Sequence, residues 1–235
     1  MQINYSYIEM QKFFCLLFIG FLFACSPTRK FEDGSRKWET EIQQLEKKDK
    51  ETVYSDNSIL LVGSSSIKFW NTISDDLYPY SPIQRGFGGS NFQDLLVYTK
   101  RLVYPHKFKA LLVFIGNDII GGKNDKTPRE VLGLFKGFEK NVRKKYKKQP
   151  IYFIAITPNE SRWIVWEKQR EANTLIKAYC ESKQNLQFID TEQIFLDEKG
   201  LPIKDYFRGD KLHLTQKGYD VWAATIKKKL DETLK

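Results

Sequence analysis

Five short apolar runs alternate with helical patterns along most of the chain, and this alternation constrains the fold more than any other feature. The runs lie at residues 58–62, 82–87, 110–115, 151–156 and 186–190. Most are continuous rather than alternately apolar and polar, as expected for parallel strands that are covered on both faces. The alternation predicts an α/β protein, a three-layer α/β/α sandwich around a mainly parallel sheet.

The clearest helical pattern covers residues 127–142, where Thr127 and Glu130 have the spacing of a capping box. Two further helices are expected at 161–183 and 215–230, one of them ending the chain. With the five apolar runs, these helices place the folded domain at residues 58–235.

Residues 26–57 are mostly polar and charged, but they contain one helical stripe. Trp38, Ile42 and Leu45 are spaced at i, i+4 and i+7, so one face of a helix could dock on the domain. We therefore expect this segment to be a tether that includes an outer helix.

The N-terminus has the pattern of an export signal. Its apolar run from Phe13 to Ala24 is shorter than the roughly 20 residues that a membrane span needs, and it fits a signal peptide core. The stretch "LFAC" resembles a bacterial lipobox. We expect residues 1–25 to be a signal peptide and Cys25 to carry lipid, anchoring an exported lipoprotein in the bacterial cell envelope, periplasmic or at the outer membrane. An ordinary secretory signal cut elsewhere and an uncleaved anchor are the alternatives.

Composition excludes several classes of function. The net charge is +9, but the lysines are spread over predicted helix ends and no known nucleic-acid module is present, so no nucleic-acid partner is expected. Cys180 is the only cysteine beyond Cys25, so the mature chain has no intrachain disulfide. With no histidine cluster and no ligand spacing, neither a metal nor another cofactor is implied. The oligomeric state is left open.

Polar segments follow the predicted strands at points that share one edge of the sheet: "GSSSI", "GFGGS", "GND" and "TPNESRW". Of the two histidines, His106 precedes the third strand and is expected at the opposite edge, at the surface or at a helix end. His213 follows Asp210 by three residues, so one turn brings both to the same side. Asp210 could then accept a hydrogen bond from Nδ1–H and leave Nε2 as a base for a serine of the triplet 64–66.

Acyl transfer by a serine also needs donors for the oxygen that becomes negative. A backbone N–H in the turn at Gly88 and Gly89 can approach closely, and the side chain of Asn117 could add a second donor. These motifs reach the predicted edge in chain order, which favours a catalytic cleft over four unrelated turns.

The residues resemble the SGNH, or GDSL, hydrolase family over roughly residues 52–232, in the blocks "LVGSSSIKFW", "QRGFGGSNFQDLL", "VFIGND" and "DKLHLTQKGY". The resemblance implies a flavodoxin-like sheet. It implies Ser65 as the nucleophile, with Asp210 and His213 completing the triad. It also implies an oxyanion hole made by the N–H groups of Ser65 and Gly89 and the side chain of Asn117. Ser64 stands where many members have Asp.

The expected function is that of a serine esterase that hydrolyses carboxylic O-acyl esters of envelope or dietary glycans or lipids. A non-catalytic glycan- or lipid-binding lipoprotein on the same fold is the alternative. Arg85, Arg162 and Trp163 are candidates to bind substrate. Arg85 could instead be a salt-bridge partner, and Arg162 and Trp163 could instead contribute to helix packing.

Overall fold

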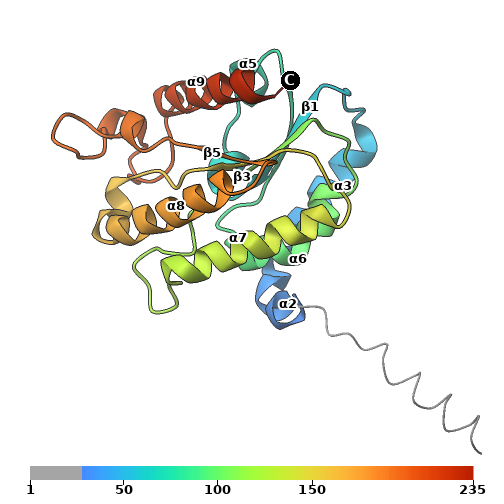
Figure 1. The fold of residues 1–235 in the computed structure, drawn as a ribbon, viewed down its shortest axis with the longest axis horizontal. Coiled ribbons are helices and arrows are strands. Elements are labelled where there is room, and N and C mark those ends of the chain that lie inside the picture. The colour runs from blue at the N-terminus through green and yellow to red at the C-terminus, as the bar shows by residue number, and fades with distance from the viewer. Residues whose placement is uncertain (1–27, 235) are drawn as a thin grey trace, which may run out of the picture. The chain divides into compact units, whose positions relative to one another are not determined.

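The computed structural model (Figure 1) describes residues 28–234. It contains a five-stranded sheet with strand order β2-β1-β3-β4-β5. All four neighbouring pairs are parallel, so the predicted flavodoxin-like α/β fold is confirmed. Each strand falls on one of the five apolar runs: β1 (Ser58–Gly63), β2 (Ser81–Gly86), β3 (Ala110–Phe114), β4 (Ile151–Ile154) and β5 (Leu186–Ile189).

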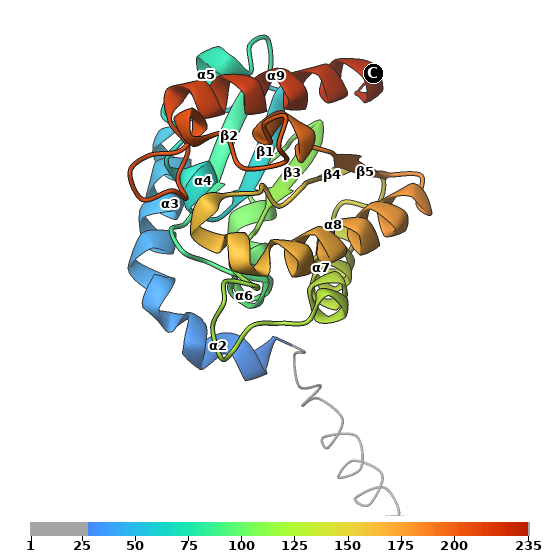
Figure 2. The same ribbon diagram turned by 90° about the vertical axis from the view of Figure 1, so that its left-hand side faces the viewer.

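Helices cover both faces of the sheet, as Figure 2 shows. One face packs against α3 (Glu39–Glu51), α6 (Phe92–Val103), α7 (Pro128–Arg143) and α8 (Trp166–Glu181). The other packs against α4 (Ser65–Lys68), α5 (Ile73–Asp76) and α9 (Gln216–Thr233). The remaining helical segments are short: α2 (Arg29–Ser35), η1 (Arg36–Trp38), η2 (Glu160–Val165), η3 (Gln193–Phe195) and η4 (Lys204–Tyr206).

Strand β1 explains why the apolar runs are continuous. Leu60 and Val62 belong to the core on one face of the sheet, whereas Ile59 and Leu61 belong to the core on the other. All four are completely buried, because the strand has a helical layer on each side.

Local signals placed one helix start correctly and missed another. Thr127 and Glu130 form the predicted capping box at the start of α7. The helix expected from residue 161 begins at Trp166 instead. Asn159 caps the 3₁₀ segment η2 first, and Arg162 leaves helical geometry at φ −119° and ψ 20°.

The N-terminal helix α3 lies within the same compact unit as the sheet, which spans Phe31–Lys235. Its Ile42 is completely buried, and Cys180 on α8 is a buried core residue. Within residues 28–234, no helix is long and apolar enough to cross a membrane. The predictions for the signal peptide and for Cys25 fall on residues 1–27, outside the described part of the chain.

Candidate active site

The serine triplet lies where β1 turns into α4. Gly63 ends the strand so close to β3 that a Cβ atom there would lie 2.2 Å from the carbonyl oxygen of Phe114, which only glycine avoids. Ser64 follows with an extended backbone and is 3% exposed. Ser65 is the first residue of α4, and its side chain is partly exposed. The turn thus buries the first hydroxyl and leaves the second accessible.

Ser65, His213 and Asp210 form one hydrogen-bonded chain. His213 Nε2 lies 2.9 Å from Ser65 Oγ, and His213 Nδ1 lies 2.7 Å from Asp210 Oδ2. Asp210 Oδ1 also accepts the backbone N–H of His213 at 2.9 Å. The turn between them passes through Lys211 at φ 61°, a left-handed conformation that is uncommon for a side-chain-bearing residue.

The electrostatics of Asp210 suit a carboxylate that orients an imidazole. Partial burial alone would raise its pKa, but hydrogen bonds from the His213 ring and from the backbone N–H groups of His213 and Leu212 lower the pKa to about 2. Asp210 is therefore ionised at neutral pH and accepts a hydrogen bond from the Nδ1–H group. Nε2 is then left with a lone pair directed at the Ser65 hydroxyl.

Asn117 is oriented by contacts on both sides of its amide. Its Nδ2 donates to the carbonyl oxygen of Ser90 at 2.8 Å, which leaves the second N–H of the group available. Its Oδ1 accepts from Arg162 Nη2 at 2.6 Å, and Arg162 Nη1 donates to the carbonyl oxygen of Gly116 at 2.7 Å. From the sequence, Arg162 was only a candidate to bind substrate. Its hydrogen bond to Asn117 was not predicted, because no sequence pattern links the two residues.

The turn after β2 carries the other expected oxyanion donor. Gly89 has φ +71°, so it occupies a conformation that favours glycine. Its N–H, like that of Ser65, has no hydrogen-bond partner among residues 28–234. The carbonyl oxygen of Ser90, next in the chain, is the group that binds Asn117.

A narrow cleft with a volume of about 30 Å³ lies beside Ser65. Its wall combines polar groups with apolar side chains, among them Ser65, Asn117, Arg162, Ile156, Phe207 and Trp222. Arg162 therefore lies at the cleft. Trp163 is not part of this wall, and its ring stacks on Trp166 with centroids 6.3 Å apart.

The prediction that Arg85 binds substrate is wrong. Its side chain is 2% exposed and forms an ion pair with Asp49 of α3 and a hydrogen bond with Tyr54. The alternation of side chains along β2 explains this placement, because Arg85 faces the helical layer that contains α3.

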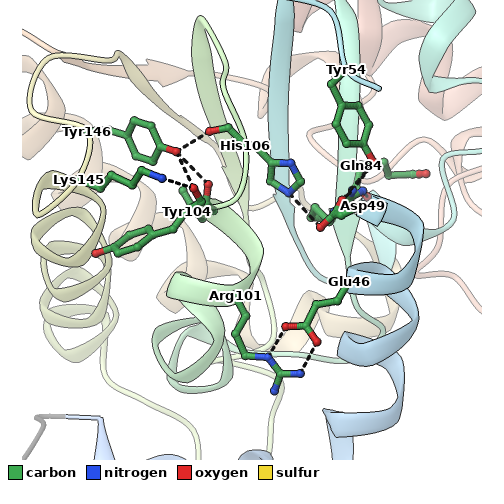
Figure 3. Close-up of polar contacts among 11 residues, drawn as sticks. Glu46, Asp49, Tyr54, Gln84, Arg101, Tyr104, His106, Lys145 and Tyr146 are labelled. Carbon is green, nitrogen blue, oxygen red and sulfur yellow. Dashed lines mark hydrogen bonds and ion pairs between the residues drawn. The ribbon is translucent and has the colours of Figure 1, made fainter. Parts of the chain in front are cut away.

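His106 belongs to the same cluster, and Figure 3 shows it beside Asp49 and Tyr54. It lies in the connection before β3, as expected, but it is buried rather than at the surface. The Asp49 carboxylate lies 3.4 Å from Nε2, yet burial, followed by the positive charges of Arg85 and Lys145, lowers the pKa of His106 to about 4. This histidine is therefore neutral at neutral pH and has no part in the cleft.

Comparisons with known structures agree on the fold. A protein from Streptococcus pneumonia described as a platelet activating factor superposes with a TM-score of 0.72 at 22% identity, covering 85% of this chain and 95% of its own. A GDSL-like lipase from Bacteroides thetaiotaomicron gives 0.65 at 17%, covering 85% and 98%. A catalytic mutant of an acetylxylan esterase from Geobacillus stearothermophilus gives 0.62 at 13%, covering 76% and 95%. The comparison with curated proteins found no match.

The sequence itself identifies the family. A model of the GDSL-like lipase/acylhydrolase family matches residues 63–221, which is more than half of the chain. The matched range begins at the glycine before the serine triplet and includes Asn117, Asp210 and His213. The chain therefore belongs to the GDSL-like lipase/acylhydrolase family and is a carboxylic ester hydrolase.

Proposed function

We propose that the protein hydrolyses O-acyl esters through a covalent acyl-enzyme on Ser65. His213 Nε2 takes the hydroxyl proton as Ser65 Oγ bonds to the acyl carbon, and the carbonyl oxygen becomes an oxyanion. The oxyanion then collapses, the ester C–O bond breaks, and the imidazolium gives its proton to the leaving alcohol. A water molecule, deprotonated by His213, attacks the acyl-enzyme and releases the acid and the free Ser65 hydroxyl.

One observation carries this proposal, namely the unbroken chain of hydrogen bonds from Asp210 through His213 to Ser65 at 2.7 and 2.9 Å. Both distances are those of good hydrogen bonds before any substrate is bound. A serine hydroxyl is a weak nucleophile at neutral pH, and a base oriented by a carboxylate is what activates it.

The developing oxyanion would be stabilised by three donors. These are the N–H groups of Ser65 and Gly89, which have no other partner among residues 28–234, and the second N–H of Asn117 Nδ2. Each donor of this kind is typically worth about 10²–10³ in kcat.

The size of the cleft favours a short acyl group. The cleft volume of about 30 Å³ beside Ser65 has room for about two or three water molecules, each of which needs about 10–15 Å³ on this measure, so an acetyl group fits better than a fatty acyl chain. One structural neighbour acts on acetylated xylan, which is an ester of this kind. We therefore propose short-chain, chiefly acetyl, esters of envelope or dietary glycans or lipids as substrates.

We also propose that the enzyme works at the bacterial cell envelope, tethered by lipid on Cys25. The support is the sequence alone: an apolar run that is short for a membrane span, followed by "LFAC". Labelling of the expressed chain with a radioactive fatty acid tests this, because Cys25→Ser should lose the label and remain uncleaved.

Hydrolysis of p-nitrophenyl acetate by the full chain tests the activity. We expect Ser65→Ala to lose at least about 10³-fold in kcat. Ser66→Ala, which removes the neighbouring hydroxyl on the same helix, should keep activity within about threefold. A wild-type chain that is inert, or a Ser65→Ala variant as active as wild type, would end the proposal. p-Nitrophenyl decanoate should be a much poorer substrate than the acetate.

A further inference from the structure

The N-terminal helix α3 contacts the glycine turn of the site, although the helix precedes residues 63–221, the range matched by the family. Glu41 Oε1 accepts the backbone N–H of Gly88 at 3.1 Å. The same oxygen lies 2.7 Å from Lys68 Nζ, at the end of α4. A side chain from outside the family range therefore holds the peptide that immediately precedes the expected oxyanion donor of Gly89.

A second residue from this segment covers the turn. The ring of Trp38 lies so close to Gly89 that a Cβ atom there would meet it at 3.3 Å. Trp38 also packs edge-to-face on Phe87, with centroids 5.9 Å apart. Gly88 is thus held at its N–H by Glu41, while Trp38 contacts the residues on either side of it.

Helix α3 has anchors of its own that do not involve the turn. Ile42 is completely buried in the core. Glu39 and Glu46 each form an ion pair with Arg101 of α6 at 2.7 Å. Figure 3 shows the Glu46–Arg101 pair and, further along the helix, Asp49 beside His106. Removal of Glu41 should therefore leave the helix docked.

We infer that Glu41 is a positioning residue whose carboxylate fixes the Gly88 peptide, so that the Gly89 N–H stays directed at the oxyanion of the Ser65 reaction. This role rests on the proposed function. Two successive glycines have wide backbone freedom, and an external anchor is what can restrict it. The bond from a backbone N–H to a carboxylate is charge-assisted and stronger than a neutral one. Donors fixed before the reaction are the ones that stabilise its transition state.

The test compares Glu41→Ala and Glu41→Gln with wild type in the full chain on p-nitrophenyl acetate. Glu41→Ala should lower kcat about tenfold and leave KM within about twofold, because the donor is misaligned rather than absent. Glu41→Gln keeps an acceptor oxygen and loses the charge, so it should retain kcat within about threefold of wild type. Glu46→Gln, the matched control, weakens the same helix at Arg101 and should leave kcat unchanged.

Amide hydrogen exchange at Gly88 gives a readout that does not depend on turnover. It should be about tenfold faster in Glu41→Ala than in wild type, and nearly unchanged in Glu41→Gln and Glu46→Gln. The inference is overturned if Glu41→Ala keeps full kcat, if Glu41→Gln is as impaired as Glu41→Ala, or if Glu46→Gln is as impaired as Glu41→Ala, and the proposed function then still stands. A wild-type chain without esterase activity instead removes the proposed function, and the positioning role with it.

Discussion

Arg162 offers a sharp perturbation of the site, because it touches the expected oxyanion donor but neither the nucleophile nor the base. Its guanidinium donates to Asn117 Oδ1 at 2.6 Å and to the carbonyl oxygen of Gly116 at 2.7 Å. Arg162→Met keeps much of the side-chain volume and removes both bonds. Asn117 then keeps only its bond to Ser90, at 2.8 Å.

The expected magnitudes follow from these contacts. Loss of one oxyanion donor costs about 10²–10³ in kcat, and a donor that is loosened rather than removed costs less, so we expect kcat to fall about 10–100-fold. KM should stay within about threefold, because the contact acts on the transition state. Two hydrogen bonds from a charged group are lost as well, which should lower the free energy of unfolding by about 2–4 kcal/mol. Arg162→Lys should have a kcat and a stability between those of wild type and Arg162→Met, because an ammonium group keeps the charge but cannot reproduce the two parallel N–H donors of the guanidinium.

The assay is steady-state hydrolysis of p-nitrophenyl acetate, with denaturant unfolding in parallel. Arg143 provides the control, because it makes the same kind of bonds, to the carbonyl oxygens of Gln149 and Asn185, before β4 and β5 at the opposite edge of the sheet. Arg143→Met should lose stability and keep kcat. In an Asn117→Ala background, Arg162→Met should cost less than about threefold. The reasoning is refuted if Arg162→Met loses the same factor with and without Asn117.

Three further predictions concern backbone strain and buried charge. Gly89→Ala places a side chain on a backbone with φ +71° and against the ring of Trp38, so kcat should fall at least about tenfold in the same assay. Gly88→Ala is the control, because its Cβ atom would make only ordinary van der Waals contacts, and its kcat should fall far less. Burial is the main cause that raises the pKa of Asp118 to about 7, so ionisation of its carboxyl destabilises the fold as the pH rises. In denaturant unfolding, the gain in stability from Asp118→Asn should therefore be about 3 kcal/mol larger at pH 9 than at pH 5. Burial and nearby positive charge lower the pKa of His106 to about 4, so lowering the pH from 6.5 to 4 should cost wild type about 3 kcal/mol of stability relative to His106→Gln. Parallel plots of the free energy of unfolding against pH for the two proteins would contradict this.

Much of the fold follows from the sequence, because local pattern and global arrangement agree. Strand β1 has four consecutive apolar residues, 59–62, because both of its faces are buried, and that requirement is visible in the sequence of the strand itself. The capping box at Thr127 and Glu130 needs only neighbouring residues. Asp210 and His213 are three residues apart, so their approach was local as well.

Other features depend on contacts between distant segments, which no local pattern encodes. The alternation along β2 turns Arg85 toward one helical layer, but only the packing of α3 in that layer brings Asp49 to it. His106 is buried in part by the same docking. The pairing of Arg162 with Asn117 spans 45 residues, and the backbone of Arg162 departs from helical geometry shortly before α8 begins.

Labelling of the full chain with a p-nitrophenyl alkylphosphonate tests the central claim most directly, because the reagent reacts only with an activated nucleophile. Peptide mass spectrometry should find a single adduct, on Ser65, with Ser64 and Ser66 unmodified. His213→Ala should label at least about 10²-fold more slowly, since its base is gone. An adduct on another residue, or equal labelling rates with and without His213, would contradict the account.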